Sequence, residues 1–133
     1  QAAVLLSKLE IFDWEIKERN RMAKIYSEEL KNSYHVPEIP QDSVSVWAQY
    51  TLQSNKRDRL ISFLKENNIP AMIYYPKPMH QQPAYKEFTL NKDLNESTKL
   101  SESVFSIPIH PYLTDLEIEY IIENLKKAKN LNL

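Results

Sequence analysis

The side chains best suited to chemistry gather in one short segment, residues 74–85, which reads YYPKPMHQQPAY. Tyr74, Tyr75 and His80 can each form hydrogen bonds, and the tyrosine rings add apolar faces. The three prolines fix φ and lack a backbone N–H, so the segment cannot be a helix interior or a central strand. A stiff loop of this kind suits ligand binding, and the alternative is a structural proline-rich connector.

Composition removes several other kinds of site. The chain contains no cysteine, which excludes disulfides, thiolate catalysis and thiolate metal ligands. It also contains no glycine, whereas average usage is about 7%. Glycine-rich loops that cradle phosphates are therefore absent from this sequence. The three histidines lack the spacing of metal ligands, so we expect no metal site.

Length and charge restrict the partners. The 133 residues suffice for one domain with a real core. The net charge of −1 gives no basic field for nucleic acid, and no apolar run approaches the roughly 20 residues of a membrane helix. We expect neither a nucleic-acid nor a membrane partner. The lack of cysteine fits a cytoplasmic location.

The first predicted helix is unusually long. Apolar residues recur near a spacing of 3.6 from Ala2 to about Lys31. A helix of this length is long for so small a domain, which suggests an element that reaches a second body. The sequence opens at Gln1 inside this pattern and has no glycine. Both features lead us to expect a piece of a longer protein.

Three strands and three further helices follow in the predicted order. Alternation predicts a strand from Val44 to Gln53, with Trp47 on the face opposite Tyr50. Two further strands are expected at 71–74 and 104–107. A second helix should be capped by Ser54 or Asn55 and end at Asn67-Asn68, and a third should run from Asn95 or Ser97 to Ser103. The last helix should begin at a Thr114–Glu117 capping box, end at about Lys129 and bury Leu116, Ile118, Ile121, Ile122 and Leu125.

These elements predict the α+β fold class. We expect a two-layer sandwich in which a short three-stranded sheet is covered by helices, with the long N-terminal helix as a connector. His110, at the end of the last strand, reads as a capping or packing residue. Trp14 is expected to pack against the missing part of the protein.

Three stretches of the sequence resemble one known family. They are QAAVLLSKL at 1–9, IYYPKPMHQQPAY at 73–85 and FSIPIHPYLTD at 105–115. In this order they resemble the C-terminal part of the DegT/DnrJ/EryC1/StrS family of pyridoxal-phosphate-dependent sugar aminotransferases. The resemblance covers nearly the whole chain. It implies that residues 1–133 are the small domain, and that a large cofactor-binding domain lies upstream.

The resemblance also implies an activity and a site. The parent enzyme is expected to move an amino group from glutamate to a keto nucleotide-sugar, as a homodimer that uses pyridoxal phosphate. The Schiff-base lysine and the other cofactor ligands belong to the large domain, so the resemblance implies no catalytic and no cofactor-binding residue in this chain. Tyr74, Tyr75 and His80 would contact the substrate. The family often has histidine where this chain has Tyr74, so acid–base chemistry at that position is in doubt.

Two other functions stay open at this stage. The chain could be a stand-alone interaction module whose first helix pairs with a partner, or a ligand-binding module without catalysis. A domain separated from a larger body should expose apolar surface on the first helix and beside the proline-rich loop. A stand-alone module should instead be polar there or should present one compact groove.

Overall fold

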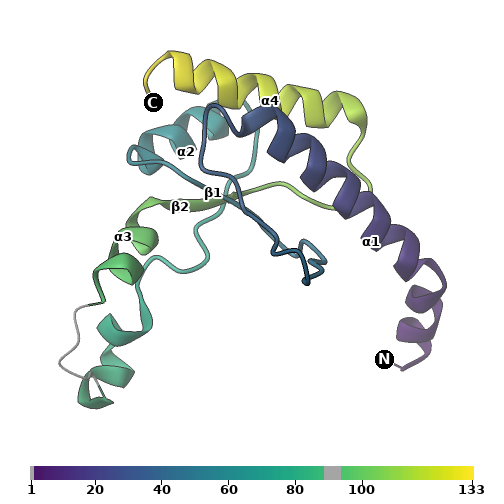
Figure 1. Cartoon of the computed structure of the whole chain (residues 1–133), viewed down its shortest axis with the longest axis horizontal. Coiled ribbons are helices and arrows are strands. Elements are labelled where there is room, and N and C mark those ends of the chain that lie inside the picture. The colour runs from purple at the N-terminus through teal and green to yellow at the C-terminus, as the bar shows by residue number, and fades with distance from the viewer. Residues whose placement is uncertain (1, 89–93) are drawn as a thin grey trace.

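The computed structural model describes residues 2–88 and 94–133, and within them helices predominate (Figure 1). The elements in chain order are α1 (Ala2–Leu30), β1 (Tyr50–Gln53), α2 (Arg57–Glu66), the 3-10 turns η1 (Met79–Gln81) and η2 (Pro83–Phe88), α3 (Asn95–Ser103), β2 (Val104–Ile107) and α4 (Asp115–Asn130). The predicted α+β class is confirmed, and each predicted helix is present within a few residues of its expected bounds.

The sheet is smaller than the sequence predicts. In the described residues it has two antiparallel strands, β1 and β2, with Tyr50 opposite Ile107 and Leu52 opposite Phe105. Isolated bridges extend it by one residue pair on each side: His35 with Gln53, and Met72 with Ser106. The predicted third strand at 71–74 is therefore wrong except for Met72. The prolines on both sides of this stretch lack the N–H that a ladder needs, which explains its brevity.

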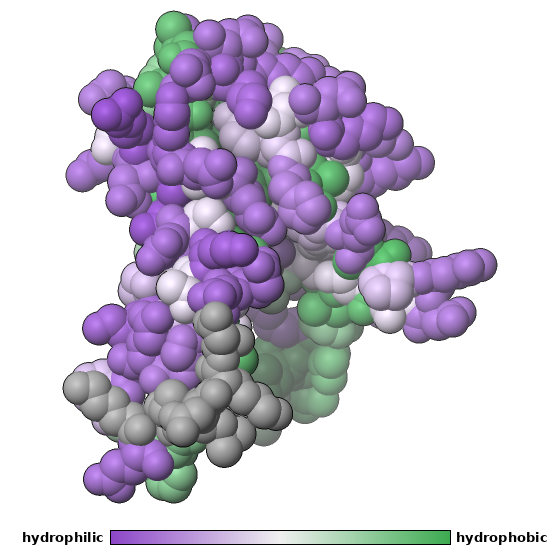
Figure 2. Space-filling view, turned by 60° about the vertical axis from the view of Figure 1, so that its left-hand side comes forward, coloured by the Kyte–Doolittle hydropathy of each residue, from purple (hydrophilic) through white to green (hydrophobic). Residues whose placement is uncertain are grey.

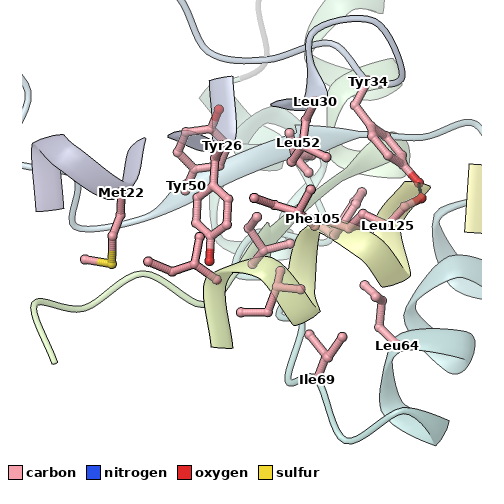
Figure 3. Close-up of a cluster of buried hydrophobic side chains, with 14 of the residues drawn as sticks. Met22, Tyr26, Leu30, Tyr34, Tyr50, Leu52, Leu64, Ile69, Phe105 and Leu125 are labelled. Carbon is pink, nitrogen blue, oxygen red and sulfur yellow. Dashed lines mark hydrogen bonds between the residues drawn. The ribbon is translucent and has the colours of Figure 1, made fainter. Parts of the chain in front are cut away.

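Helices α1, α2 and α4 cover one face of the sheet, whereas α3 and the proline-rich loop project from its other side (Figure 1). Tyr50, Leu52, Phe105 and Ile107 point toward the helices and are buried. Figure 3 shows the centre of this core. Its largest fully buried side chains are Tyr26, Tyr50, Phe105, Met22, Leu30, Leu52, Leu60, Leu64, Ile118 and Leu125.

The first strand begins later than predicted, and the conformation of Trp47 explains the difference. Instead of extending from Val44, regular pairing begins at Tyr50, because Trp47 has a φ of 48° and turns the chain. A bulky residue in this left-handed region costs roughly 1–2 kcal/mol. The turn places the Trp47 ring in the core at 8% exposure, with its centroid 5.4 Å from that of Tyr50. The rings of Trp47 and Tyr50 therefore both lie in the core, whereas the alternating pattern predicts that they lie on opposite faces of the strand.

The helix ends show how a chain without glycine terminates its helices. Asn68, with φ 57°, follows α2, and the Ile69 N–H donates to the Leu64 carbonyl at 2.8 Å while the Asn68 N–H donates to Lys65 at 3.0 Å. This pair of bonds is a Schellman motif, in which Asn68 takes the place that glycine usually has, and the predicted end of this helix at Asn67-Asn68 is confirmed. The start of α2 differs from the prediction, since Lys56 is the N-cap and Ser54 Oγ accepts from the Lys56 N–H instead.

The last helix begins as predicted. Thr114 Oγ1 accepts from the Glu117 N–H, and the Glu117 carboxylate accepts from the Thr114 N–H at 2.8 Å, which together form the capping box. These bonds to Thr114 hold the pKa of Glu117 below its usual value. The predicted inner face of α4 is buried at four positions, but Leu116 is 77% exposed because the first turn extends past the core.

Helix α1 divides into two halves with different surroundings. Its C-terminal half packs in the core through Met22, Ala23, Tyr26 and Leu30. Its N-terminal half extends beyond the rest of the chain (Figure 1), and Val4, Leu5, Leu6 and Leu9 are 63–66% exposed. The helical periodicity of the sequence is therefore confirmed over the whole length, although half of the apolar stripe has no covering element in the described residues.

Candidate functional site

The proline-rich loop leaves the sheet at Met72, whose N–H and C=O both bond to the backbone of Ser106, at 3.0 and 2.8 Å. Tyr74, two residues later, is half-exposed and lines a hollow of about 200 Å³ at the end of the sheet. Ala48, Gln49, Pro70, Met72, Ser106, Ile107, Pro108 and Ile109 complete the lining. This hollow brings together three segments that are far apart in the sequence, and it offers the Tyr74 hydroxyl and the Gln49 amide as polar groups.

Tyr75 lines a different hollow, of about 390 Å³, between the loop and α3. Its side chain is among the most exposed of the aromatic groups, at 72%. Lys77, Pro78, Met79, Gln82, Ser97, Leu100, Ser101 and Val104 form the rest of the lining. The hollow is mainly apolar and has one cation, Lys77, in its lining, so it suits a ring face better than a charged group alone.

His80 is half-buried in η1, on the side of the loop that faces α3. Its Nε2 lies 3.5 Å from Thr98 Oγ1, and the Gln81 amide donates to the same Thr98 oxygen at 3.1 Å. These contacts tie the loop to α3 and orient the imidazole. The geometry thus gives His80 a positioning contact within the chain as well as a polar ring atom on the proline-rich loop.

The three predicted site residues therefore lie on one loop but do not converge on one pocket. Among the hollows in the described part of the chain, Tyr74 and Tyr75 line separate ones, and His80 lies beside the second. The described residues include no group of histidines and carboxylates that could hold a metal ion. An arrangement of aromatic rings, hydroxyls and amides can bind a polar ligand but contains no evident reactive centre.

A contact that the sequence analysis did not identify holds one wall of the Tyr74 hollow. Asn20 of α1 accepts from Trp47 Nε1 at 3.1 Å and donates to the carbonyls of Ser45 and Ile16, at 3.3 and 2.9 Å. Arg19 donates to the Trp47 carbonyl at 3.4 Å. No local pattern marks Asn20, because two of its three partners, Ser45 and Trp47, lie more than 20 residues away along the chain.

Glu15 and Tyr112 form a second contact that the sequence did not reveal. The Tyr112 hydroxyl donates to Glu15 Oε1 at 2.7 Å, and Glu15 is only 8% exposed although it lies in the projecting half of α1. This hydrogen bond lowers the pKa of Glu15, and the Lys8 ammonium 3.5 Å away acts in the same direction. It also raises the pKa of Tyr112. The pair fixes the segment after β2 to α1.

Trp14 and His110 surround this pair. The Trp14 ring lies 5.6 Å from that of Tyr112, centroid to centroid, so it packs against this chain, yet about half of its surface stays exposed. His110 Nδ1 accepts from the Tyr112 N–H at 3.3 Å, which confirms its expected capping role.

Apolar side chains are exposed in the two places that the sequence analysis named. At the proline-rich loop these are Met72, Tyr74, Tyr75, Met79, Tyr85 and Phe88, and on the first helix they are Val4, Leu5, Leu6, Leu9, Ile11, Phe12 and Trp14. Figure 2 shows hydrophobic atoms gathered at the lower end of the molecule, where α1 projects. In the described residues no helix combines the length and apolarity that crossing a bilayer requires.

Comparison with known proteins identifies the family. The model of the DegT/DnrJ/EryC1/StrS aminotransferase family matches residues 1–126. The chain belongs to this family. Among curated DegT/DnrJ/EryC1/StrS relatives, it is 37% identical over 122 residues to the UDP-2-acetamido-2-deoxy-3-oxo-D-glucuronate aminotransferase of Pseudomonas aeruginosa, an alignment that covers 91% of this chain and 33% of that protein.

A second curated relative and a solved structure give the same family. The chain is 32% identical over 128 residues to the dTDP-3-amino-3,6-dideoxy-alpha-D-galactopyranose transaminase of Aneurinibacillus thermoaerophilus, covering 96% of this chain and 35% of that one. A crystal structure of a DegT/DnrJ/EryC1/StrS aminotransferase from Brucella abortus superposes with a TM-score of 0.91 at 42% identity, over 96% of this chain and 34% of that one. This chain thus spans about a third of the length of these relatives.

Proposed function

We propose that residues 1–133 form the C-terminal small domain of a pyridoxal-phosphate-dependent aminotransferase that transfers the amino group of glutamate to a keto nucleotide-sugar. The observation that carries this proposal is the family match over residues 1–126, and its relatives are named for UDP- and dTDP-linked sugars. The exposed apolar residues of α1 and of the loop support it, because a large domain would cover them. A stand-alone module is instead expected to be polar in these places or to present one compact groove.

The described residues do not fit the cofactor site itself. A pyridoxal enzyme needs a lysine for the Schiff base and an acidic partner for the pyridine nitrogen. Every lysine side chain that the structure describes is exposed or half-buried. Lys77 lines the hollow beside Tyr75, but no carboxylate lines it. We therefore derive no catalytic step from this chain and assign the cofactor to the rest of the enzyme.

The role of this chain is then to contact the substrate. Tyr74, Tyr75 and His80 supply hydroxyls, ring faces and an imidazole beside two hollows of about 200 and 390 Å³. Pockets that enclose drug-sized ligands measure roughly 300–1,000 Å³, so the hollow beside Tyr74 is below this range and the one beside Tyr75 is at its lower end. We therefore assign one part of a nucleotide-sugar to each hollow. Tyr74 offers a hydroxyl that can donate and accept hydrogen bonds, and we assign it a binding role.

The substrate class follows from the relatives. A UDP-linked acetamido sugar is the first substrate to test, because the Pseudomonas aeruginosa relative is named for one at 37% identity. We assign the enzyme to the cytoplasm as a homodimer, on the family resemblance.

The test uses the full-length enzyme that contains this chain. With glutamate and a keto nucleotide-sugar, we expect 2-oxoglutarate to form in proportion to the amino sugar. Tyr75→Phe and His80→Gln should each raise the KM for the sugar several-fold, while the half-reaction with glutamate keeps its rate. Tyr120→Phe, an exposed tyrosine on α4, and His35→Gln are the matched controls. No product with any nucleotide-sugar, or equal losses in both half-reactions, would contradict the proposal.

A further inference from the structure

Segment 45–49 forms one side of the Tyr74 hollow, through Ala48 and Gln49. It is neither helix nor strand, and both lining residues are exposed. A wall of this kind holds its shape only if other contacts fix the backbone. Those contacts are made by Ser45 and by Trp47, the residue at which the chain turns.

Asn20 holds both of these residues. Its Nδ2 donates to the Ser45 carbonyl at 3.3 Å, and its Oδ1 accepts from Trp47 Nε1 at 3.1 Å. The orientation of the amide is determined, because an indole N–H can only donate and must face the oxygen. No other side chain of similar size has one acceptor and two donors, so neither aspartate nor leucine could make the same set of bonds.

Trp47 explains why such a restraint is needed. Its φ of 48° is unfavourable for a bulky residue, so the segment would relax to an extended backbone if it were released. Burial of the ring against Tyr50, the bond from the Trp47 N–H to Ser45 Oγ at 3.2 Å and the bond from Arg19 to the Trp47 carbonyl at 3.4 Å act together with Asn20. Relaxation would move Ala48 and Gln49, which are the next two residues.

We infer that Asn20 is a positioning residue for the substrate hollow, which fixes the wall formed by Ala48 and Gln49 beside Tyr74 and thereby sets the affinity for the nucleotide-sugar. Asn20 itself lines neither this hollow nor the one beside Tyr75. The inference rests on the proposed function, since the ligand of the hollow is taken to be that substrate.

Two measurements test it, with Asn124→Ala as the matched control. Asn124 lies on α4 and donates to the Tyr120 carbonyl at 2.9 Å, the same i to i−4 bond that Asn20 makes to Ile16, but it lies outside the hollow. The first measurement is the indole N–H signal of Trp47 in the ¹⁵N spectrum of the 133-residue chain, assigned with Trp14→Phe. In Asn20→Ala, we expect this proton to exchange with water at least tenfold faster, and in Asn124→Ala to keep its rate.

The second measurement uses the full-length enzyme. Asn20→Ala should raise the KM for the nucleotide-sugar about tenfold and leave the glutamate half-reaction within twofold, while Asn124→Ala changes neither. Trp47→Phe keeps a ring but loses the indole donor, so it should also raise the KM for the nucleotide-sugar. This variant replaces Asn20→Ala in the test if Asn20→Ala does not fold. An unchanged indole signal, or an unchanged sugar KM in an active enzyme, overturns the inference alone. A wild-type enzyme that aminates no nucleotide-sugar overturns the proposed function instead.

Discussion

Single tyrosines link separate parts of the fold through one hydroxyl each. Tyr34 follows α1 and donates to the Leu125 carbonyl of α4 at 2.8 Å (Figure 3). Tyr26 donates to the Pro108 carbonyl, and Tyr50 bonds to Ser27. Buried polar groups need such partners, and none of the buried side-chain polar atoms in the described residues lacks one.

Replacing Tyr34 by phenylalanine should reduce the free energy of unfolding by about 1 kcal/mol, because the hydrogen bond from its hydroxyl to the Leu125 carbonyl is lost. Burial also raises the pKa of Tyr34 from 10.0 to about 12. Since the folded pKa is the higher one, this stabilisation is complete below pH 10 and declines as the pH rises toward 12. Urea denaturation between pH 7 and 12 should show a shallower decline of the free energy of unfolding for Tyr34→Phe than for the wild-type chain, and an equal decline would contradict this prediction.

At the scale of elements, the absence of glycine places asparagine at the helix ends. Asn68 and Asn132 both have a φ of 57° just beyond α2 and α4. Asparagine tolerates this conformation better than most residues but less well than glycine.

Asn68→Gly should therefore raise the free energy of unfolding of the chain by roughly 0.5 kcal/mol, and Asn68→Ala should lower it by about 1 kcal/mol. Ser62→Gly, in the interior of the same helix, should lower it by roughly 0.5 kcal/mol, because glycine is a poor helix former there. Thermal unfolding of the three variants tests this reading. A loss of stability in Asn68→Gly would show that the asparagine side chain, not its backbone conformation, ends α2.

At the scale of the whole molecule, the core and the proposed binding surface are separated. The core lies between the sheet and α1, α2 and α4, and the proline-rich loop lies on the other side (Figure 1). The projecting half of α1 has few contacts within the described residues apart from the Glu15–Tyr112 pair and the Trp14 ring.

The chain alone should not retain pyridoxal phosphate, because the described lysines are exposed or half-buried and lack the acidic partner that the cofactor requires. After incubation with the cofactor and desalting, we expect no absorbance in the visible range, whereas the full-length enzyme should keep such a band. Retention of a stoichiometric band by the 133-residue chain would show that a cofactor site exists within it.

The sequence by itself determined the helices, because their periodicity, capping box and terminal asparagines are local signals that act within a few residues. It also indicated Tyr74, Tyr75 and His80, since a run of prolines makes a loop wherever it occurs. Only the tertiary structure decided where the first strand begins, because a distant residue, Asn20, helps to hold the turn at Trp47. It likewise decided that Leu116 is exposed and that Glu15 bonds Tyr112, since burial and pairing depend on segments that meet only after folding.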